Sequence, residues 1–240
     1  MLHARNLKKI QGTFSLSIEN LQIKTPGIYG LIGPNGCGKS TTAKLLCGIL
    51  TPDSGEIAIE LDSVDITMIT QKPYIMDSTV FNNLAYPLQL RGRKGYKPLC
   101  DEYLEKIGFL ERKNQRARAL SGGEKQKLAL LRAMIFRPRL IILDEAMTEL
   151  DLDSIELFEG MILERQKVDP VIWIIISHQL VQISQLCDYI FFMANGQVEI
   201  EGPMEKLLCS ANPLVTRFLR HKILETKPRA EKKNIETITC

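Results

Sequence analysis

A glycine-rich segment near the start of the chain also contains a lysine and a hydroxyl side chain. Gly33-Pro34-Asn35-Gly36-Cys37-Gly38-Lys39-Ser40 fits the pattern G-x-x-x-x-G-K-[ST] of a phosphate-binding loop. Its glycines let backbone N–H groups turn toward phosphate oxygens, and the helix expected next adds the positive end of its dipole. Lys39 would bring a positive charge to the β- and γ-phosphates, and the Ser40 hydroxyl would bind Mg²⁺. An ordinary glycine-rich turn is the alternative, which the apolar run before the loop and the helical pattern after it disfavour.

Two carboxylates follow an apolar run in the second half of the chain. Leu140–Leu143 reads LIIL, and Asp144 and Glu145 come directly after it. A carboxylate at the carboxyl end of a parallel strand lies at the edge of the sheet where ligands bind. We expect Asp144 to hold Mg²⁺ through water and Glu145 to accept a proton from an attacking water. Acids often follow strands without such a role, but the phosphate-binding loop upstream favours the catalytic interpretation.

A serine and two glycines precede a long helical pattern. The segment Leu120-Ser121-Gly122-Gly123-Glu124-Lys125-Gln126 leads into residues 127–136. Exposed N–H groups at such a helix start would form a second anion site, whereas the simpler interpretation makes Ser121 a plain N-cap. Two such sites exceed what one nucleotide needs in one monomer. The second site therefore makes sense if it serves a neighbouring subunit.

The elements that must position these residues alternate between strand-like and helix-like patterns, which indicates an α/β fold with a largely parallel core sheet. Strands are expected over residues 14–23, 27–32, 140–143, 171–176 and 189–193, and a helix over 39–50. Asn195-Gly196 predicts a tight hairpin turn. Residues 76–138 are richer in charge and helix formers and predict a mostly helical lobe, inserted into a core formed by 1–75 and 139–219.

Composition and charge limit the class of protein. The 240 residues are 45% hydrophobic and 25% charged, as in ordinary globular proteins, which excludes collagen-like and wholly disordered chains. The net charge is +3, and residues 220–240 account for all of it, since six bases and three acids lie there. The neutral remainder, residues 1–219, argues against a dedicated nucleic-acid binder. Residues 220–240 are expected to form a basic, disordered tail.

The cysteines and the apolar runs indicate the compartment. The six cysteines are scattered without a C-x-x-C pair, as expected of reduced cytosolic thiols. Cys37, inside the phosphate-binding loop, is either a small filler or a redox switch, because a helix start lowers the pKa of a thiol. The longest aliphatic-aromatic run, Val171–Ile176, is far shorter than the roughly 20 residues that span a bilayer. If the protein serves a membrane, another chain is expected to supply the spanning part.

Taken together, five ordered motifs resemble those of ATP-binding cassette (ABC) proteins, in particular the nucleotide-binding subunit of an ABC transporter. The resemblance covers about residues 1–215 and rests on GPNGCGKST (33–41), Gln71, LSGGEKQ (120–126), LIILDEA (140–146) and His178. It implies the P-loop NTPase fold of ABC ATPases. That fold has a RecA-like parallel-sheet core, a small antiparallel β subdomain and an inserted helical lobe.

The resemblance also implies a mechanism and partners. Two subunits would dimerise head to tail, and each ATP would lie between Gly33–Thr41 of one and Ser121–Glu124 of the other. Hydrolysis would drive separate transmembrane permease subunits from the cytoplasmic face of the membrane. One cassette without a fused membrane domain favours an importer, with a possible solute-binding protein. Ser78–Gly92 resembles the counterpart in tungstate, molybdate and related oxyanion importers, and is expected to border the groove where a membrane subunit's coupling helix docks.

Further roles follow only by match to the family. Gln71 resembles the glutamine that senses Mg²⁺ and the attacking water, and His178 resembles the histidine that contacts the γ-phosphate. Asp151, in Thr148-Glu149-Leu150-Asp151, resembles the aspartate of the dimer-crossing loop. A lone glutamine or histidine after a strand would otherwise carry no such meaning.

The chain departs from the family pattern at two places. Gln11 occupies the slot where several members carry an aromatic residue that stacks on adenine, so stacking would be lost there or pass to Phe14, which is otherwise a core residue. Thr148 and Glu149 stand where small residues are commoner. Glu149 adds a negative charge near the expected subunit boundary, for which the sequence offers no explanation.

Two other functions fit part of the pattern. A soluble ABC ATPase of translation or DNA repair would share the motifs, but this chain has one cassette, no coiled-coil insertion and a neutral body. A P-loop kinase would use the phosphate-binding loop, but the LSGGE segment has no role there. ATP hydrolysis coupled to solute import is therefore the primary prediction.

Overall fold

The computed structural model describes residues 1–226, which divide into two compact units. The first unit contains Met1–Glu60 and the described residues from Ile175 onward, and the second contains Leu61–Ile174. Each unit has its own strands, helices and buried apolar side chains. The phosphate-binding loop therefore belongs to the first unit, and the carboxylates Asp144 and Glu145 belong to the second.

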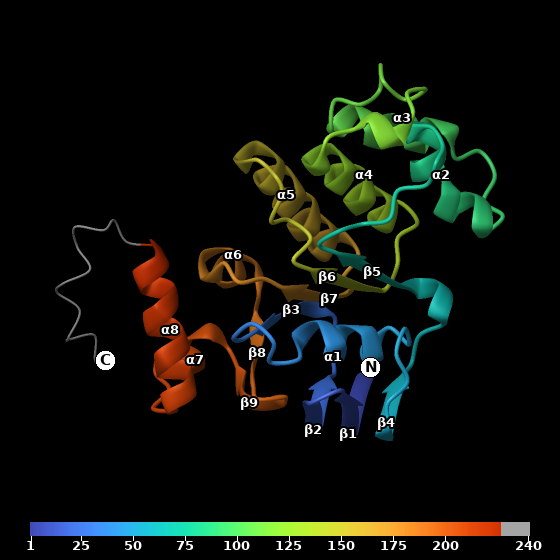
Figure 1. The fold of residues 1–240 in the computed structure, drawn as a ribbon. Helices are drawn as coiled ribbons and strands as arrows, with labels where there is room; N and C mark the ends of the chain where they lie inside the picture. Colours follow the sequence, from blue (N-terminus) through green and yellow to red (C-terminus); the bar gives the residue numbers. More distant parts are fainter. Residues whose placement is uncertain (227–240) are drawn as a thin grey trace. The chain divides into compact units, whose positions relative to one another are not determined.

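Three antiparallel strands form the small sheet of the first unit (Figure 1). Strand β1 (Leu2–Gln11) is the central one, between β2 (Phe14–Ile23) and β4 (Ser54–Ile59). The apolar side chains of β2 face inward and are buried, namely Leu16, Ile18, Leu21 and Ile23. The edge strand predicted over residues 14–23 is confirmed. Burial of one face fixes its register, because a shift by one residue would move the buried side chains to the exposed face.

A parallel pair and a hairpin carry the ligand-binding end of the first unit. Strand β3 (Gly27–Ile32) pairs in parallel with β8 (Tyr189–Ala194), and β8 pairs antiparallel with β9 (Gln197–Gly202). The β8–β9 turn is Asn195-Gly196, with φ of 50° and 78°. Asparagine and glycine adopt this left-handed conformation most readily, so the predicted hairpin turn is confirmed.

Helices of the first unit follow these strands, and they are α1 (Lys39–Leu46), α6 (Leu180–Leu186), α7 (Met204–Leu208) and α8 (Pro213–Thr226). Helix α1 ends before Gly48, whose φ is 69°, and does not continue to residue 50 as predicted. Residues 220–226, predicted to belong to the tail, are part of α8. The reason is an apolar face that buries Val215, Phe218 and Leu219. The remainder of the predicted tail, 227–240, lies outside the described residues.

Parallel strands organise the second unit. Strand β5 (Ile66–Thr70) pairs in parallel with β6 (Leu140–Asp144), with Ile66 opposite Leu140 and Thr70 opposite Asp144. Next to β6 comes β7 (Ile172–Ile176), which begins in this unit. Every residue of β6 and β7 is buried, as the continuous apolar runs in the sequence predicted.

Helices fill most of residues 76–138 (Figure 1). They are α2 (Val80–Leu90), α3 (Lys97–Lys106) and α4 (Gly122–Met134), and α5 (Leu152–Val168) follows β6. Helix α2 packs against both α3 and α4. Helix α4 begins at Gly122, at the helix start expected in the LSGGE segment, because a capping box at Ser121 starts it. No helix within residues 1–226 combines the length and the apolar character needed to cross a bilayer.

Candidate functional site

Glycine is required at several positions of the phosphate-binding loop. The φ angles of Gly33, Gly36 and Gly38 are 147°, 76° and 109°. A Cβ atom on Gly33 would lie 2.0 Å from the backbone oxygen of Met193, and one on Gly38 would lie 2.7 Å from Leu16 Cδ1. The loop therefore takes a path that side chains exclude, which is what a backbone cradle for phosphate needs.

Lys39 is the first residue of α1, and its charged group is held at the loop. The side chain is buried, and Nζ donates to the carbonyl oxygens of Gly33 and Pro34, each at 2.9 Å. Ser40 and Thr41 follow in the first turn of the helix. This places an ammonium group, two hydroxyls and the positive end of a helix dipole beside one backbone loop.

Cys37 fills space inside the same loop. Its side chain is buried, and Sγ lies 3.9 Å from Lys39 Nζ. Burial raises the pKa of the Cys37 thiol, although the nearby charge of Lys39 acts in the opposite direction. Desolvation therefore outweighs the lowering of the thiol pKa that the redox-switch alternative requires. The structure supports the interpretation of Cys37 as a small filler.

The slot at the end of β1 contains amide and hydroxyl groups. Gln11 is exposed, and its Oε1 accepts a hydrogen bond of 3.4 Å from the Thr41 hydroxyl. Phe14 packs against the loop, with its Cζ 3.0 Å from the position of a Cβ on Gly38. Phe14 also lines a hollow of about 290 Å³ with Asn35 and Cys37. These contacts favour a packing role for Phe14.

Glu145 and Gln71 follow paired positions at the ends of two parallel strands. Thr70 is opposite Asp144, so Gln71 and Glu145 each leave the sheet at the same edge of the second unit. Asp144 is buried, and Gln71 is exposed. Glu145 has a φ of 53°, and its carbonyl oxygen accepts a 2.8 Å hydrogen bond from the Thr148 hydroxyl. Gln71, Asp144 and Glu145 therefore lie at the carboxyl ends of neighbouring strands in the second unit.

The loop after Gln71 is held by two side chains, Asn83 and Arg132, that belong to none of the sequence motifs. Asn83 of α2 is completely buried, donates to the oxygens of Met76 and Thr79 at 3.1 and 2.9 Å, and accepts from Met76 N at 2.9 Å. Arg132 of α4 donates to Tyr74 O at 2.5 Å. The only sequence signal for this role of Asn83 was an amide side chain at a helix position that faces apolar neighbours.

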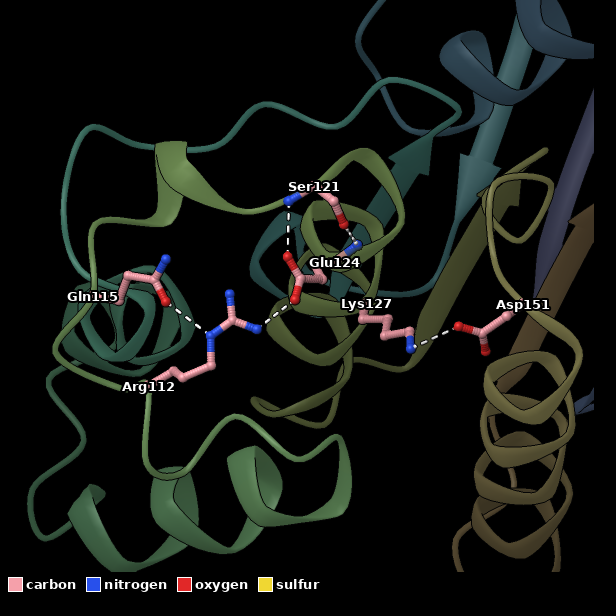
Figure 2. A network of polar contacts seen from close by, with 6 residues as sticks. All are labelled: Arg112, Gln115, Ser121, Glu124, Lys127 and Asp151. Atoms are coloured by element: carbon pink, nitrogen blue, oxygen red, sulfur yellow. Dashed lines mark hydrogen bonds and ion pairs between the residues drawn. The ribbon is translucent and has the colours of Figure 1, made fainter.

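The LSGGE segment starts α4 with a complete capping box (Figure 2). Ser121 Oγ accepts from the N–H of Glu124 at 3.3 Å, and Glu124 Oε2 accepts from the N–H of Ser121 at 2.8 Å. The remaining oxygen, Oε1, accepts from the guanidinium of Arg112. Ser121 is thus an N-cap, and the N–H groups of Gly122 and Gly123 form the first turn of the helix.

Glu149 lies beside the two glycines of this segment. A Cβ on Gly122 would lie 3.1 Å from Glu149 Oε2, and one on Gly123 would lie 3.0 Å from Glu149 O. The unexplained negative charge of the sequence is therefore next to the start of α4. A larger residue at 122 would displace only the Glu149 carboxylate, whereas one at 123 would press against the Glu149 backbone.

Asp151 links the loop after β6 to α4. It caps α5 by accepting from the N–H of Ser154 at 2.9 Å, and it forms an ion pair with Lys127 of α4 at 3.1 Å (Figure 2). The hydrogen bonds from Ser154, together with Lys127, lower the pKa of Asp151 to about 2. Gln126 Nε2 donates to Ala146 O at 2.5 Å as a second link. The sequence did not predict these links.

His178 belongs to the first unit, where it follows β7 and is half-buried. Its neighbour Ser177 is buried, and the Ser177 hydroxyl accepts from the N–H of Gln179 at 3.1 Å. The predicted site residues are thus divided between the units. Gly33–Thr41 and His178 lie in the first, and Gln71, Ser121–Glu124, Asp144, Glu145 and Asp151 lie in the second.

A groove of about 630 Å³ opens in the second unit, lined by β5, α2, α4 and the loop after β5. Tyr86 and Leu90 of α2 are exposed there, and Arg91 lies with its guanidinium 3.7 Å from the ring centroid of Phe136. Arg132 contributes a second cation. The segment Ser78–Gly92 therefore borders a groove that is mainly apolar and has two positive charges.

Comparisons with known proteins decide the family. A family model described as ABC transporter matches residues 16–148, which is more than half of the chain. This chain belongs to the ABC transporter family. It is 35% identical over 206 residues to the tungstate uptake system ATP-binding protein TupC of Peptoclostridium acidaminophilum, a match that covers 82% of this chain and 96% of that protein. It is 30% identical over 240 residues to the methionine import ATP-binding protein MetN of Carboxydothermus hydrogenoformans, which covers 92% and 70%.

The fold agrees with this membership. A solved structure of the ATP-binding subunit of an ABC transporter matches with a TM-score of 0.81 and 22% identity, covering 91% of this chain and 99% of that one. The chain is thus an ABC transporter ATP-binding subunit and ATPase. It has the predicted α/β fold, with a mixed parallel sheet and a small antiparallel sheet. At this identity the solved structure supports the fold alone.

Proposed function

We propose that this ABC ATPase energises solute import through separate membrane subunits. The observation that carries the proposal is the phosphate-binding loop, whose backbone path depends on glycine and whose Lys39 ammonium is held beside it. Import is supported by the relatives, since TupC is a tungstate uptake protein and MetN a methionine import protein by name.

The phosphates and Mg²⁺ would be held mainly by the first motif. Gly33–Thr41 would wrap the phosphates with backbone N–H groups, and Lys39 would balance their negative charge. Ser40 and Asp144 are oxygen donors of the kind that Mg²⁺ prefers, and Gln71 would join them through its amide oxygen. Mg²⁺ usually takes one or two protein groups with phosphate oxygens and water. The chemistry of these oxygen donors therefore fits Mg²⁺. Residues 1–226 contain no cluster of three or more histidine, cysteine, aspartate or glutamate side chains that could hold a metal without the nucleotide.

Glu145 would be the group that polarises the attacking water. It follows a buried strand and leaves the same sheet edge as Gln71, which would orient that water. His178 would contact the γ-phosphate. In this scheme the protein supplies position and charge stabilisation, and no covalent intermediate is needed.

A second copy of the chain would complete each site. The N–H groups at the start of α4, with the Ser121 hydroxyl, would bind the γ-phosphate of ATP held by the partner. Asp151 would lie in the dimer-crossing loop. Its ion pair with Lys127 would couple that loop to the LSGGE segment within one subunit.

The groove of the second unit would receive the permease. Its apolar lining, with Arg91 and Arg132, suits an amphipathic helix that carries a carboxylate. Such docking would place the chain on the cytoplasmic face of the membrane, with a solute-binding protein as a further partner and no nucleic acid. We propose an oxyanion of the tungstate or molybdate type as solute, supported by the tungstate uptake for which TupC is named.

The test is capture of the complex from native membranes with a Glu145→Gln variant in ATP and Mg²⁺. We expect a polytopic membrane protein to be recovered, with a solute-binding protein if the system is an importer. Turnover should fall by about 100-fold or more while ATP binding persists. Glu156→Gln, an exposed acid on α5, is the matched control and should hydrolyse ATP normally. Recovery of ribosomes or nucleic acid without a membrane protein would overturn transport, and normal turnover of Glu145→Gln would overturn the role of Glu145.

A further inference from the structure

The Glu124 carboxylate has two different partners, one on each oxygen. Oε2 accepts from the backbone N–H of Ser121, and Oε1 accepts from Arg112 (Figure 2). The Ser121 hydroxyl accepts from the N–H of Glu124. Glu124 therefore shapes the donor face of the LSGGE segment through its side chain and its main chain.

This arrangement puts a negative charge in the first turn of a helix that is proposed to bind phosphate. The Glu124 side chain is 26% exposed, so water screens its charge only in part. Together with Glu149 at Gly122, it makes the surroundings of the glycine pair acidic. An uncompensated carboxylate in this position would repel a γ-phosphate.

Arg112 is the cation that faces Glu124, and it is held in place before any ligand arrives. Its Nε donates to Gln115 Oε1 at 2.8 Å (Figure 2), and its guanidinium lies 5.4 Å from the ring centroid of the buried Phe109. Hydrogen bonding to Arg112 and to Ser121 lowers the pKa of Glu124 to about 2, so the pair is fully charged at neutral pH. A fixed guanidinium loses little freedom when it serves as a counter-charge.

We propose that Arg112 is a positioning residue for the second anion-binding loop. It neutralises Glu124 and holds that carboxylate on Ser121, so that the Gly122 and Gly123 N–H groups and the Ser121 hydroxyl receive the γ-phosphate bound by a second copy. This inference rests on the proposed head-to-tail dimer and adds to it a residue outside the five motifs. Arg112 acts through Glu124 and does not touch the nucleotide.

A neighbouring ion pair provides a matched control. Lys113 pairs with Asp101 at 2.9 Å, and the two side chains are 36% and 37% exposed, close to the 39% of Arg112. This pair joins the same segment to α3 and contacts no residue of the LSGGE motif. A general loss of stability from removing one surface ion pair should therefore be equal in Arg112→Ala and Lys113→Ala.

The experiment measures ATP-driven dimerisation by light scattering, in full-length Glu145→Gln protein that cannot turn over. We expect Arg112→Ala to raise the ATP concentration for half-maximal dimerisation by about tenfold, and Lys113→Ala by less than about twofold. Adding Glu124→Gln to Arg112→Ala should restore dimerisation to within about twofold of the parent. The reason is that glutamine carries no charge, while its Oε1 can still accept from the Ser121 N–H.

Three outcomes would count against these ideas and are distinguishable. Equal effects of Arg112→Ala and Lys113→Ala would overturn the role of Arg112 and leave the dimer intact. Failure of Glu124→Gln to restore the Arg112→Ala protein would overturn charge neutralisation as the cause. A Glu145→Gln parent that binds ATP but stays monomeric, alone and with its membrane partner, would overturn the proposed dimer itself.

Discussion

The two glycine-containing loops of this chain, Gly33–Ser40 and Leu120–Gln126, are maintained by different forces. The first takes its path from glycine backbone angles and from close approach to the main chain, as at Met193 O. The second is shaped by side chains. Glu124 and Gln126 bond to Arg112 and to Ala146 O, and Lys127, directly after the loop, bonds to Asp151. The path of the first loop therefore depends on the absence of side chains at its glycines, and that of the second depends on side-chain hydrogen bonds and ion pairs.

This difference determines how each loop responds to change. A backbone cradle tolerates few substitutions, and it contains no titratable acid. A loop held by ion pairs tolerates conservative substitutions, but it depends on the charge of partner residues 12 to 24 positions away in the sequence. The following substitutions test this distinction.

Gly33→Ala should have the largest effect, because the new methyl group would meet Met193 O at 2.0 Å, a distance that neither backbone can relieve by rotation. We expect a loss of about 4 kcal/mol or more in the free energy of unfolding, together with loss of ATP binding. Gly36→Ala is the control, since its φ is 76° but no atom lies within 4 Å, and strain alone should cost about 1–2 kcal/mol. Urea unfolding compares them, and equal losses would show that the close approach at Gly33 is unimportant.

Asn83→Ala tests whether side chains hold the loop after Gln71. Four hydrogen bonds of a completely buried amide would be lost, including one from Arg132, and the N–H of Met76 would lose the partner it has now, so we expect a loss of about 2–4 kcal/mol. The neighbouring Asn82 is exposed, and Asn82→Ala should cost about 0.5 kcal/mol or less. Thermal unfolding of both variants is the measurement. Similar melting temperatures would contradict a structural role for Asn83.

The sequence was sufficient for features that depend on local residue types. The glycines at 33, 36 and 38, the apolar runs of β6 and β7 and the Asn195-Gly196 turn all act over a few residues, and each was predicted in place. The family motifs then led to the fold class, which the comparisons confirmed. The helix start at Ser121 was predicted as well, and the capping box there outweighs the weak helix propensity of Gly122 and Gly123.

Contacts between distant segments could not be predicted in the same way. Arg112, Asn83 and Arg132 carry no motif, and their importance comes from partners up to 58 residues away, as for Arg132 and Tyr74. Cys37 shows a similar limit, since desolvation depends on the packed environment and reverses the pKa expected from a helix start. The roles proposed for Gln71, Glu145 and His178 remain predictions from the family match.

Acid should loosen the second loop and its neighbours. The folded pKa values of Glu124 and Asp151 are both lowered to about 2, below their ordinary values of 4.5 and 3.8. A lowered folded pKa gives stability that is present above the unfolded pKa and is lost as the pH falls toward the folded one. The difference in urea midpoint between wild type and Asp151→Asn should thus be largest near pH 6 and shrink from about pH 4 toward pH 2. Asp153→Asn, at an exposed neighbour, is the control. A difference between wild type and Asp151→Asn that stays constant from pH 6 to pH 2 would contradict the lowered pKa of Asp151.

The smallest effect is expected at Cys37, where the first loop should prove insensitive to thiol chemistry. The Cys37 thiol is buried and its pKa is raised, so little thiolate forms at neutral pH and alkylating reagents cannot reach it. Iodoacetamide at pH 7.5 should modify the exposed Cys209 before Cys37 and leave Cys37 unmodified until urea unfolds the protein. Peptide mass spectrometry identifies the modified cysteine, and Cys209→Ser removes one competing thiol. Rapid modification of Cys37 with loss of ATPase activity would instead mean that the phosphate-binding loop opens readily. The backbone of this loop would then not be rigid, and the proposed difference between the two loops would be wrong.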